Sequence, residues 1–291
     1  MIISPIFYMG NKKKLIKKGL IDLFPNNIDT MVDLFGGSSV VSMNTEANRY
    51  FVSDIDSNLA SLYQLFKYEK PEKIIKHIEQ RVNEFDLPKE RTRRCDFKGK
   101  EDLIEKYKKA YMNFRKHYNE NKNVLDFYTL MFYSFSQQFR FNNKGDFNMP
   151  YGTDYFSELN EQYIKNGCDF FGKNNVFIGK SDFRTLNIDH LKSNDFVYLD
   201  PPYLNTTAVY NENDGWNEKD EEDLYDLCER LNNKGINFGL SNVFLNKGIE
   251  NTKLIEWCDR NNWKIYTFDK ISYSACGKGN SNAKEVFITN Y

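Results

Sequence analysis

A four-residue segment, Asp200-Pro201-Pro202-Tyr203, has the residue types needed to grip a planar amine. It directly follows the apolar run Phe196 to Leu199, which predicts a short buried strand. Two successive prolines fix the backbone and leave carbonyls that only accept hydrogen bonds. The Asp200 carboxylate and the Pro201 carbonyl therefore form a rigid acceptor pair beside an aromatic ring. An exocyclic amine with two N–H donors fits this pair, and a plain strand terminator before a turn is the structural alternative.

A glycine-rich turn near the N-terminus is a second element with chemical potential. The apolar run Met31 to Phe35 breaks at Gly36-Gly37-Ser38-Ser39, and such a turn after the first strand of a doubly wound sheet lets backbone approach a nucleotide-like ligand. Asp54 follows Gly37 by 17 residues and ends another apolar run, where an acid can hold ribose hydroxyls. The turn is not G-x-G-x-x-G, so a dinucleotide has no evident pyrophosphate site. Taken alone, the turn is equally compatible with a purely structural role.

A parallel sheet is needed to bring these residues together, and the chain supplies the pattern for one. Apolar runs of strand length alternate with stretches of helical periodicity, which predicts an α/β fold. The predicted elements are a strand at Met31 to Phe35, a helix from Val40 to Met43, a strand at Tyr50 to Asp54, a helix through Leu59 to Phe66, strands at Asn175 to Gly179 and Asp195 to Leu199, a helix at Glu218 to Leu231, a strand at Ile236 to Leu240, a helix at Lys247 to Arg260, and strands at Trp263 to Phe268 and Glu285 to Thr289.

Residues 57–175 interrupt this alternation. They contain long charged and aromatic helical stretches such as Leu103 to Tyr118, followed by the Asn- and Gly-rich segment Phe139 to Gly152. We interpret 57–175 as a mostly helical inserted domain, and 1–56 plus 176–291 as the domain that carries the sheet.

Bulk composition is permissive rather than decisive. The 291-residue chain has a net charge of −1, which by itself argues against a nucleic-acid partner, since phosphate contacts need clustered Lys and Arg. Residues 57–175 nevertheless hold 21 Lys and Arg against 17 Asp and Glu. Such basic runs are as often solvated helix faces as binding surfaces.

Cysteine usage and hydropathy predict a cytoplasmic protein without a metal centre. The five cysteines are widely spaced and form no C-x-x-C pair, which fits a reducing compartment and no metal. No apolar run approaches the roughly 18 residues of a membrane helix, and no basic segment precedes an apolar one at the N-terminus. We expect no membrane association and no targeting peptide.

Several short motifs together resemble the Dam-type (D12 class, alpha group) DNA adenine-N6 methyltransferases of phages and bacteria. The resemblance extends over essentially the whole chain, in the order typical of that family. Besides Asp200 to Tyr203, its parts are Tyr8-Met9-Gly10-Asn11-Lys12, Asp33-Leu34-Phe35-Gly36-Gly37, Asp54-Ile55-Asp56, Arg140 to Gly152, Ser181-Asp182-Phe183 and Phe238-Gly239-Leu240-Ser241-Asn242.

The resemblance implies a Rossmann-like, S-adenosylmethionine-dependent methyltransferase sheet with an inserted target-recognition domain at 57–175. Asp200, Pro201, Pro202 and Tyr203 would be the catalytic residues. The positions that would hold S-adenosylmethionine are Tyr8, Lys12, Asp33, Phe35, Gly37, Asp54, Asp182, Phe183 and Asp200. Tyr8 stands where many relatives have Trp, and Ser38 and Ser39 stand where further glycines are common.

The same resemblance implies double-stranded DNA as the partner and a recognition hairpin near 139–152. By the usual pairing geometries Arg140 and Lys144 are candidates for guanine, and Asn142 and Asn148 for adenine; Pro150 belongs to the same hairpin. GATC is one candidate site, although relatives that recognise it often carry Leu-Arg at the positions of Asn143-Lys144. A restriction endonuclease companion is compatible with this family.

The implied reaction needs the target adenine to be flipped out, because its N6 atom faces the partner base in a duplex. The polar segment Asn205 to Trp216 has the composition of a lid over such a base. Other methyltransferases that act on RNA adenine, on guanine or on a protein glutamine would keep the same acceptor pair. A nicotinamide oxidoreductase and a catalytically silent DNA-binding protein are alternatives from other classes.

Overall fold

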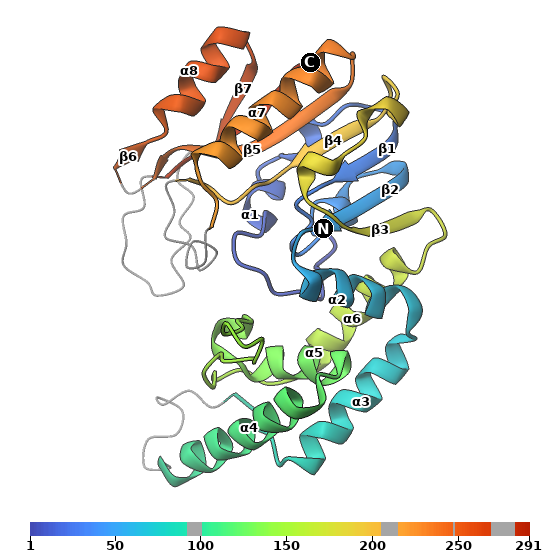
Figure 1. Cartoon of the computed structure of the whole chain (residues 1–291). Coiled ribbons are helices and arrows are strands. Elements are labelled where there is room, and N and C mark those ends of the chain that lie inside the picture. The colour runs from blue at the N-terminus through green and yellow to red at the C-terminus, as the bar shows by residue number, and fades with distance from the viewer. Residues whose placement is uncertain (92–100, 205–214, 247, 269–282) are drawn as a thin grey trace. The chain divides into compact units, whose positions relative to one another are not determined.

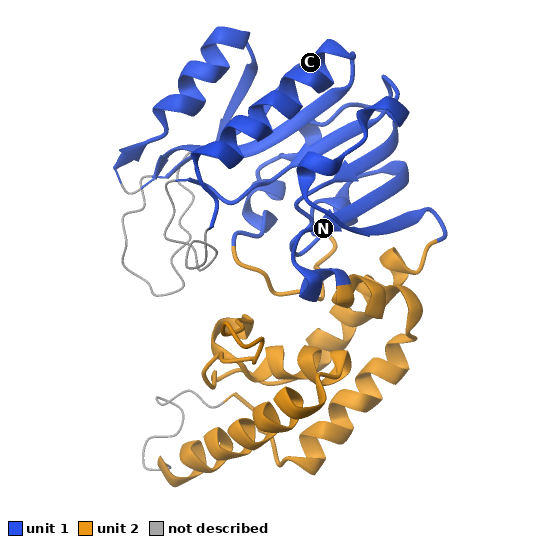
Figure 2. Cartoon of the chain, in the orientation of Figure 1, with its two compact units in different colours: residues 1, 10–60, 174–291 blue, residues 2–9, 61–173 orange. Residues whose placement is uncertain are grey.

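The computed structural model describes residues 1–91, 101–204, 215–246, 248–268 and 283–291 (Figure 1). The chain forms two compact units (Figure 2). The first unit contains residue 1 and residues 10–60 and 174–291, and the second contains residues 2–9 and 61–173. Each unit is described by itself.

The first unit is built on a mostly parallel sheet with the order β3-β2-β1-β4-β5-β8-β7. Strands β1 to β5 pair in parallel, whereas β8 pairs antiparallel with both β5 and β7. The strands are β1 (Ile28–Asp33), β2 (Ala47–Asp54), β3 (Val176–Lys180), β4 (Phe196–Leu199), β5 (Asn237–Asn246), β6 (Ile249–Glu250, paired with β5), β7 (Lys264–Phe268) and β8 (Lys284–Thr289). The predicted α/β fold with a Rossmann-like sheet is confirmed.

Buried side chains explain why the central strands form. Every residue of β4 is buried, as expected of a parallel strand covered on both faces. On one face, Val197 and Leu240 pack with Leu224 of α7 (Glu218–Asn233) and Trp257 of α8 (Thr252–Asn261). On the other, Phe24 contacts the rings of Phe196, Tyr198 and Phe287. The sheet is therefore a rigid platform for the loops at its carboxyl edge.

The remaining short elements of this unit are 3₁₀ or single-turn helices. They are α1 (Lys13–Ile16), η1 (Ile21–Leu23), η2 (Ser42–Asn44), η4 (Phe183–Thr185) and η5 (Ile188–His190).

Two predicted helices of the first unit differ from the structure. The helix predicted at Val40 to Met43 was wrong, because only the 3₁₀ turn η2 forms there and the chain is already extended at Thr45. Left-handed backbone at Ser39 (φ 56°) precedes the turn. The helix predicted from Lys247 begins only at Thr252, because Ile249–Glu250 pairs with the extended end of β5.

The second unit is mostly helical. Its helices are α2 (Ser57–Tyr68, whose first residues belong to the other unit), α3 (Pro71–Glu84), α4 (Glu101–Asn121), α5 (Val124–Tyr133), η3 (Phe135–Gln137) and α6 (Glu158–Phe171). The residues of α5 from Asp126 to Tyr133 are all buried, which is typical of a helix surrounded by others. Among the helices that the structure describes, none is long and apolar enough to span a membrane.

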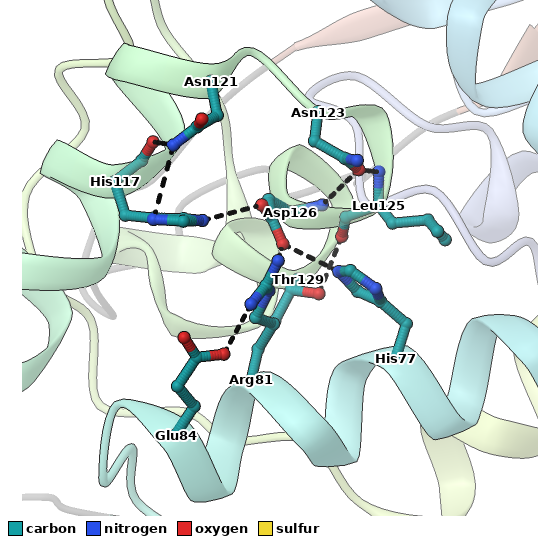
Figure 3. A network of polar contacts seen from close by, with 9 residues as sticks. All are labelled: His77, Arg81, Glu84, His117, Asn121, Asn123, Leu125, Asp126 and Thr129. Atoms are coloured by element: carbon teal, nitrogen blue, oxygen red, sulfur yellow. Dashed lines mark hydrogen bonds and ion pairs between the residues drawn. The ribbon is translucent and has the colours of Figure 1, made fainter.

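One buried carboxylate connects three helices of this unit (Figure 3). Asp126 of α5 is fully buried, and its Oδ1 lies 2.7 Å from both His77 Nε2 and Arg81 Nε of α3. His117 Nε2 of α4 lies 3.4 Å from Oδ2. Burial alone would raise the pKa of Asp126, but hydrogen bonds with His77 and Arg81 outweigh burial and hold that pKa below its ordinary value. Asp126 is therefore held as a carboxylate by the Arg81 guanidinium and by its hydrogen bond with His77.

Residues 2–9 pack with the helical unit, although the expected division placed them with the sheet. Tyr128 donates to the carbonyl of Pro5 at 3.0 Å, and Phe7 contacts Phe132 edge to face. Gly167 of α6 leaves room for the Pro5 ring, since a Cβ there would collide with it. The apolar N-terminal segment is drawn to this aromatic core because it buries Ile6 there.

Candidate active site

Three predicted site acids lie at the carboxyl edge of the sheet. Asp33 ends β1, Asp54 ends β2 and Asp200 follows β4. The strands are adjacent and parallel, with Asp33 paired in register with Val52 and Tyr198. The topology of the sheet itself therefore brings the three carboxylates to one edge, where doubly wound folds bind ligands.

Lys12 is the cation at this edge. Its Nζ lies 2.7 Å from Asp200 Oδ1, and the two side chains are 3% and 18% exposed. The same ammonium group donates to the carbonyl of Gly10 at 2.9 Å and lies 5.2 Å from the centroid of the Tyr203 ring. Burial raises the pKa of Asp200, while Lys12 and a hydrogen bond with Tyr203 oppose that rise. Lys12 thus pairs with the Asp200 carboxylate and also lies against the Tyr203 ring.

The hydroxyl of Tyr203 has a second buried partner that sequence analysis missed. It donates to Glu285 Oε2 of β8 at 3.2 Å, and Glu285 is 1% exposed. The only sequence signal is an acid inside an otherwise apolar strand, Lys284–Thr289. Pro201 is buried and Pro202 partly buried, so the segment from Asp200 to Tyr203 is anchored along its length.

Asp54 receives hydrogen bonds from the predicted glycine-rich turn. The backbone N–H of Gly37 donates to its Oδ2 and that of Asp56 to its Oδ1, both at 3.0 Å. Gly37 has a φ of 48°, a conformation that glycine adopts at little cost. Burial raises the pKa of Asp54 to about 6, against the lowering effect of these backbone donors. The turn and Asp54 therefore form one preorganised element.

Asp33 is the most strongly perturbed of the three acids. The Ser42 hydroxyl donates to its Oδ2 at 2.6 Å, whereas its buried Oδ1 has no hydrogen-bond partner among the described residues. Burial raises the pKa of Asp33 to about 7, with added repulsion from Asp200 and Asp54. Three carboxylates at one sheet edge, of which Asp200 is paired with Lys12, form a site that favours a cationic ligand.

An aromatic group lies in the same unit. Phe35, which follows β1, and Phe183 are 5.4 Å apart between ring centroids. Trp216 contacts both rings, at 5.7 and 5.6 Å, and was not among the predicted site residues. Its signal in the sequence is a lone Trp just before Asn217, the N-cap of α7. The three rings offer flat apolar surface of the kind that holds a purine.

Asp182, predicted to contact a cofactor, is engaged by a neighbouring arginine. Its carboxylate accepts from Arg184 Nη1 at 2.9 Å and caps the 3₁₀ turn η4 through the Arg184 N–H. Arg184 also contacts Asp220 and Asp223 of α7 and lies over the Phe183 ring. Arg184 therefore ties the Asp182–Phe183 segment to α7.

The predicted DNA-binding residues all belong to the second unit, in an antiparallel turn between Ser134 and Tyr151. Arg140 Nε donates to Asn148 Oδ1 at 2.9 Å. Asn142 Oδ1 accepts from the backbone of Lys144 and Asp146, so its oxygen is used in building the turn. Lys144 is exposed.

Pro150 and Tyr8 are the remaining predicted site residues of the second unit. Pro150 is exposed, and its carbonyl accepts from Phe135 at 2.9 Å. Tyr8 also belongs to the second unit, where it packs on Phe139. The lid predicted at Asn205 to Trp216 lies outside the described residues as far as position 214. The described residues contain no His, Cys, Asp and Glu cluster able to hold a metal ion.

The family of D12 class N6 adenine-specific DNA methyltransferases matches residues 8–270 of this chain. The chain belongs to this family. The family-level resemblance drawn from the sequence is thereby confirmed.

Three curated relatives align with most of this chain. The type II methyltransferase M.FokI of Planomicrobium okeanokoites is 36% identical over 298 aligned positions, and the modification methylase StsI of Streptococcus sanguinis is 35% identical. Each alignment covers 99% of this chain and 43% of the relative. A DNA adenine methylase of Vibrio cholerae is 27% identical across 73% of this chain and 72% of its own length. The chain thus spans less than half of the first two relatives.

Proposed function

We propose that this D12 class chain transfers a methyl group from S-adenosylmethionine to N6 of an adenine in double-stranded DNA. The observation that supports this best is the arrangement around Asp200, with Lys12 at 2.7 Å, Tyr203 beside it and the acceptor pair directly after β4. An alternative that needs a pyrophosphate, such as a nicotinamide oxidoreductase, has no use for this arrangement.

The residues at the sheet edge fit S-adenosylmethionine chemically. The molecule carries a positive sulfonium and an ammonium group, which suit Asp33, Asp54 and Asp200 gathered near one lysine. Asp33 Oδ1 is buried without a partner among the described residues, and an unsatisfied buried acceptor favours a cationic or donor group. In the proposal Asp54 accepts the ribose hydroxyls. The adenine of the cofactor packs on the surface that the contacting rings of Phe35 and Phe183 form together.

S-adenosylmethionine supplies a methyl group on a positively charged sulfur, and the chain supplies orientation and electrostatics. The lone pair of an adenine amine is delocalised into its ring, which makes the amine a poor nucleophile. Hydrogen bonds from the amine to Asp200 and the Pro201 carbonyl favour a more tetrahedral nitrogen and stabilise the positive charge that develops there. The nitrogen–carbon bond forms as the carbon–sulfur bond breaks, and the nitrogen then releases a proton to Asp200 or to solvent.

Lys12 and Tyr203 give this site its shape. Because Lys12 lies over one side of the Tyr203 ring, the opposite side is the surface available for stacking on a flipped adenine. Stacking is worth about 1–3 kcal/mol per base, which offsets part of the cost of unstacking from the duplex. In-line positioning of amine and methyl carbon would provide much of the remaining rate.

The turn around Arg140 is the proposed base-reading element, inside a target-recognition domain formed by the helical unit. The Arg140–Asn148 hydrogen bond uses the guanidinium Nε, which leaves two terminal amino groups suited to the acceptors of guanine. Lys144 and Pro150 line the same exposed turn, and Asn142 contributes through turn geometry. GATC remains one candidate site.

The names of two relatives suggest a biological setting. They are called a type II methyltransferase and a modification methylase, so we include a restriction endonuclease companion and a bacterial or phage-infected cytoplasm in the proposal. DNA is favoured over RNA as the substrate, because the family is one of DNA methyltransferases.

A substrate panel tests the reaction. Purified protein would be incubated with S-adenosylmethionine labelled in the methyl group and, in parallel, with unmethylated duplex DNA, single-stranded RNA or a glutamine-containing peptide. The proposal expects label on duplex DNA only, recovered as N6-methyladenine after digestion to nucleosides. Label on RNA or peptide, or on another nucleoside, would contradict it.

A further inference from the structure

The return strand of the recognition turn, residues 145–149, has partners along both edges. One edge pairs with the outgoing strand, where Phe141 forms an antiparallel bridge with Phe147. Asn148 N donates to Arg140 O at 3.0 Å, and Asn142 N donates to Asp146 O at 2.9 Å. Successive residues of a strand direct their backbone groups to opposite edges. The backbone groups of Phe147 and Met149 therefore face away from this pairing, as does the carbonyl of Gly145, whose N–H closes the turn by donating to Asn142 O at 2.8 Å.

Helix α4 takes up those outward-facing groups with its side chains. Asn119 makes two bonds to one residue, because its Nδ2 donates to Phe147 O at 3.1 Å and its Oδ1 accepts from Phe147 N at 2.8 Å. The other contacts are Tyr111 Oη to Met149 O (2.8 Å), Arg115 Nη1 to Met149 O (3.0 Å), and Lys122 Nζ to Gly145 O (2.7 Å) and Asp146 Oδ1 (2.9 Å).

The spacing of Arg115, Asn119 and Lys122 matches the repeat of a strand, because they contact Met149, Phe147 and Gly145 in turn. Positions 111, 115, 119 and 122 lie on one face of a helix, since neighbours on a face are three or four residues apart. Four helical residues rise about 6 Å, close to the roughly 6.7 Å spanned by two strand residues. The side chains of α4 therefore bind the outer edge of the return strand as the backbone of a neighbouring strand would, and α4 runs antiparallel to that strand.

This pairing selects one register. In the present register Phe147 packs with Phe141, Phe127 and Tyr118, while Asn148 meets Arg140 on the opposite face. A shift by one residue would exchange the two faces of the strand. The Asn148 side chain, which accepts from Arg140, would then point toward the rings of Phe141, Phe127 and Tyr118. Asn119 opposes this shift most directly because it binds both the N–H and the C=O of a single residue.

The position of α4 is itself fixed from the core. His117 of α4 lies beside the carboxylate of Asp126, which Arg81 and His77 of α3 also hold (Figure 3). Tyr118, the next residue of α4, packs against Phe127 of α5. The contacts of Asn119 with the turn therefore start from an anchored helix.

We propose that Asn119 is a positioning residue for DNA recognition: it sets the register of the return strand, and so the site preference, without contacting a base. This inference rests on the proposed function, since it assumes that the turn around Arg140 reads DNA. Neither Asn119 nor α4 belongs to any of the motifs on which the family resemblance rests.

The test compares Asn119→Ala with Asn113→Ala, the same change at an exposed position of the same helix. The site of the wild type is first mapped by sequencing methylated plasmid DNA. The ratio of kcat/KM on a duplex with that site to kcat/KM on its single-base variants is then measured. We expect Asn119→Ala to lower this ratio about tenfold, from the loss of two hydrogen bonds. The kcat on the mapped site and the KM for S-adenosylmethionine should stay unchanged.

Two further measurements keep the inference testable if Asn119→Ala is poorly stable. Asn119→Asp keeps the acceptor for Phe147 N and loses the donor, so it should show an intermediate ratio. Hydrogen–deuterium exchange of peptides covering 145–149 should be faster in Asn119→Ala and unchanged in Asn113→Ala, with no need for activity.

The outcomes separate this inference from the proposed function. Unchanged site preference in an active Asn119→Ala enzyme, unchanged exchange at 145–149, or a uniform loss of kcat on every duplex would overturn the inference alone. A wild-type protein that labels no duplex DNA would remove the proposed function, and with it the recognition role of Asn119.

Discussion

The pKa values of the buried carboxylates are shifted in opposite directions in the two units. In the sheet unit, Asp33, Asp54 and Asp200 gather near one lysine, and burial raises the pKa of each. In the helical unit, Asp126 is held by an arginine and flanked by two histidines, and its pKa is lowered. An excess of buried carboxylates over cations indicates a binding site for a cationic ligand, whereas a carboxylate paired with an arginine inside a helical core indicates a structural role.

The two units also position their functional side chains differently. Strand ends place the acids of the sheet unit, so the backbone topology suffices. The recognition turn has no such frame, and side chains of α4 hold its backbone from outside. Changes in the sheet unit should therefore alter rate or cofactor affinity, and changes in the helical unit should alter stability or site preference.

The largest effect is expected from Lys12→Met in the sheet unit. The change removes the cation next to Asp200, and loss of one preorganised electrostatic group typically lowers kcat about 10²–10³-fold. Single-turnover methylation of duplex DNA measures it, with the exposed Lys17→Met as the matched control. Site preference should not change. A kcat within threefold of the wild type, or altered site preference, would break the division between the units.

A smaller effect, on stability, is expected from Asp126→Asn in the helical unit. Asparagine keeps one acceptor oxygen but removes the negative charge opposite Arg81, and since Arg81 and His77 are partly exposed the cost should be about 2–4 kcal/mol. Urea denaturation measures it, with the exposed Asp169→Asn of α6 as the control.

The pH dependence of this difference has a defined sign. Because the pKa of Asp126 is lowered in the folded protein, its stabilisation is complete above the unfolded pKa of about 3.9 and is lost as pH falls through the folded pKa. The gap between wild type and Asp126→Asn should therefore be at its full size above about pH 4 and should shrink as the pH falls further. A gap that is independent of pH would contradict the ionised role of Asp126.

The smallest expected effect is the pH dependence of cofactor binding at Asp54. Its pKa is raised to about 6, so the ligand-free folded protein binds a proton that the unfolded chain releases, and stability falls as pH rises from about 4 to 6. S-adenosylmethionine binding favours the carboxylate, so affinity should weaken up to about tenfold from pH 7 to pH 5.

Calorimetric titration with S-adenosylmethionine at several pH values measures this effect. Position 54 cannot titrate in Asp54→Asn, so its affinity should be weaker at pH 7 and should fall less than that of the wild type down to pH 5, with the remaining dependence due to Asp33, whose pKa is about 7. Wild-type affinity that does not vary between pH 5 and 7 would contradict the role given to Asp54.

Sequence alone identified the parts of the molecule in which function follows local order. The placement of Asp200 after an apolar strand and of Asp54 after the glycine-rich turn could be predicted, because each lies at the end of the strand that carries it. The family resemblance added Lys12. The helix expected at Val40 to Met43 failed because periodicity over so few residues does not distinguish an α-helix from a 3₁₀ turn.

Residues whose role depends on distant partners could not be predicted. Glu285 meets Tyr203 across 82 positions of sequence, and Asn119 meets Phe147 across 28. Neither pair has a local pattern, since each contact exists only after the chain has folded. Asn142 shows the converse, because a residue type suited to reading adenine is used to build the turn.

The most direct test of the account compares the wild type with Asp200→Ala, and with the exposed Asp226→Ala as control, in the transfer of label from S-adenosylmethionine to unmethylated duplex DNA. The account predicts labelled N6-methyladenine from the wild type and from Asp226→Ala. It predicts a rate at least about 10²-fold lower from Asp200→Ala with duplex binding retained. Equal labelling by Asp200→Ala, or label on any nucleoside other than N6-methyladenine, would contradict it.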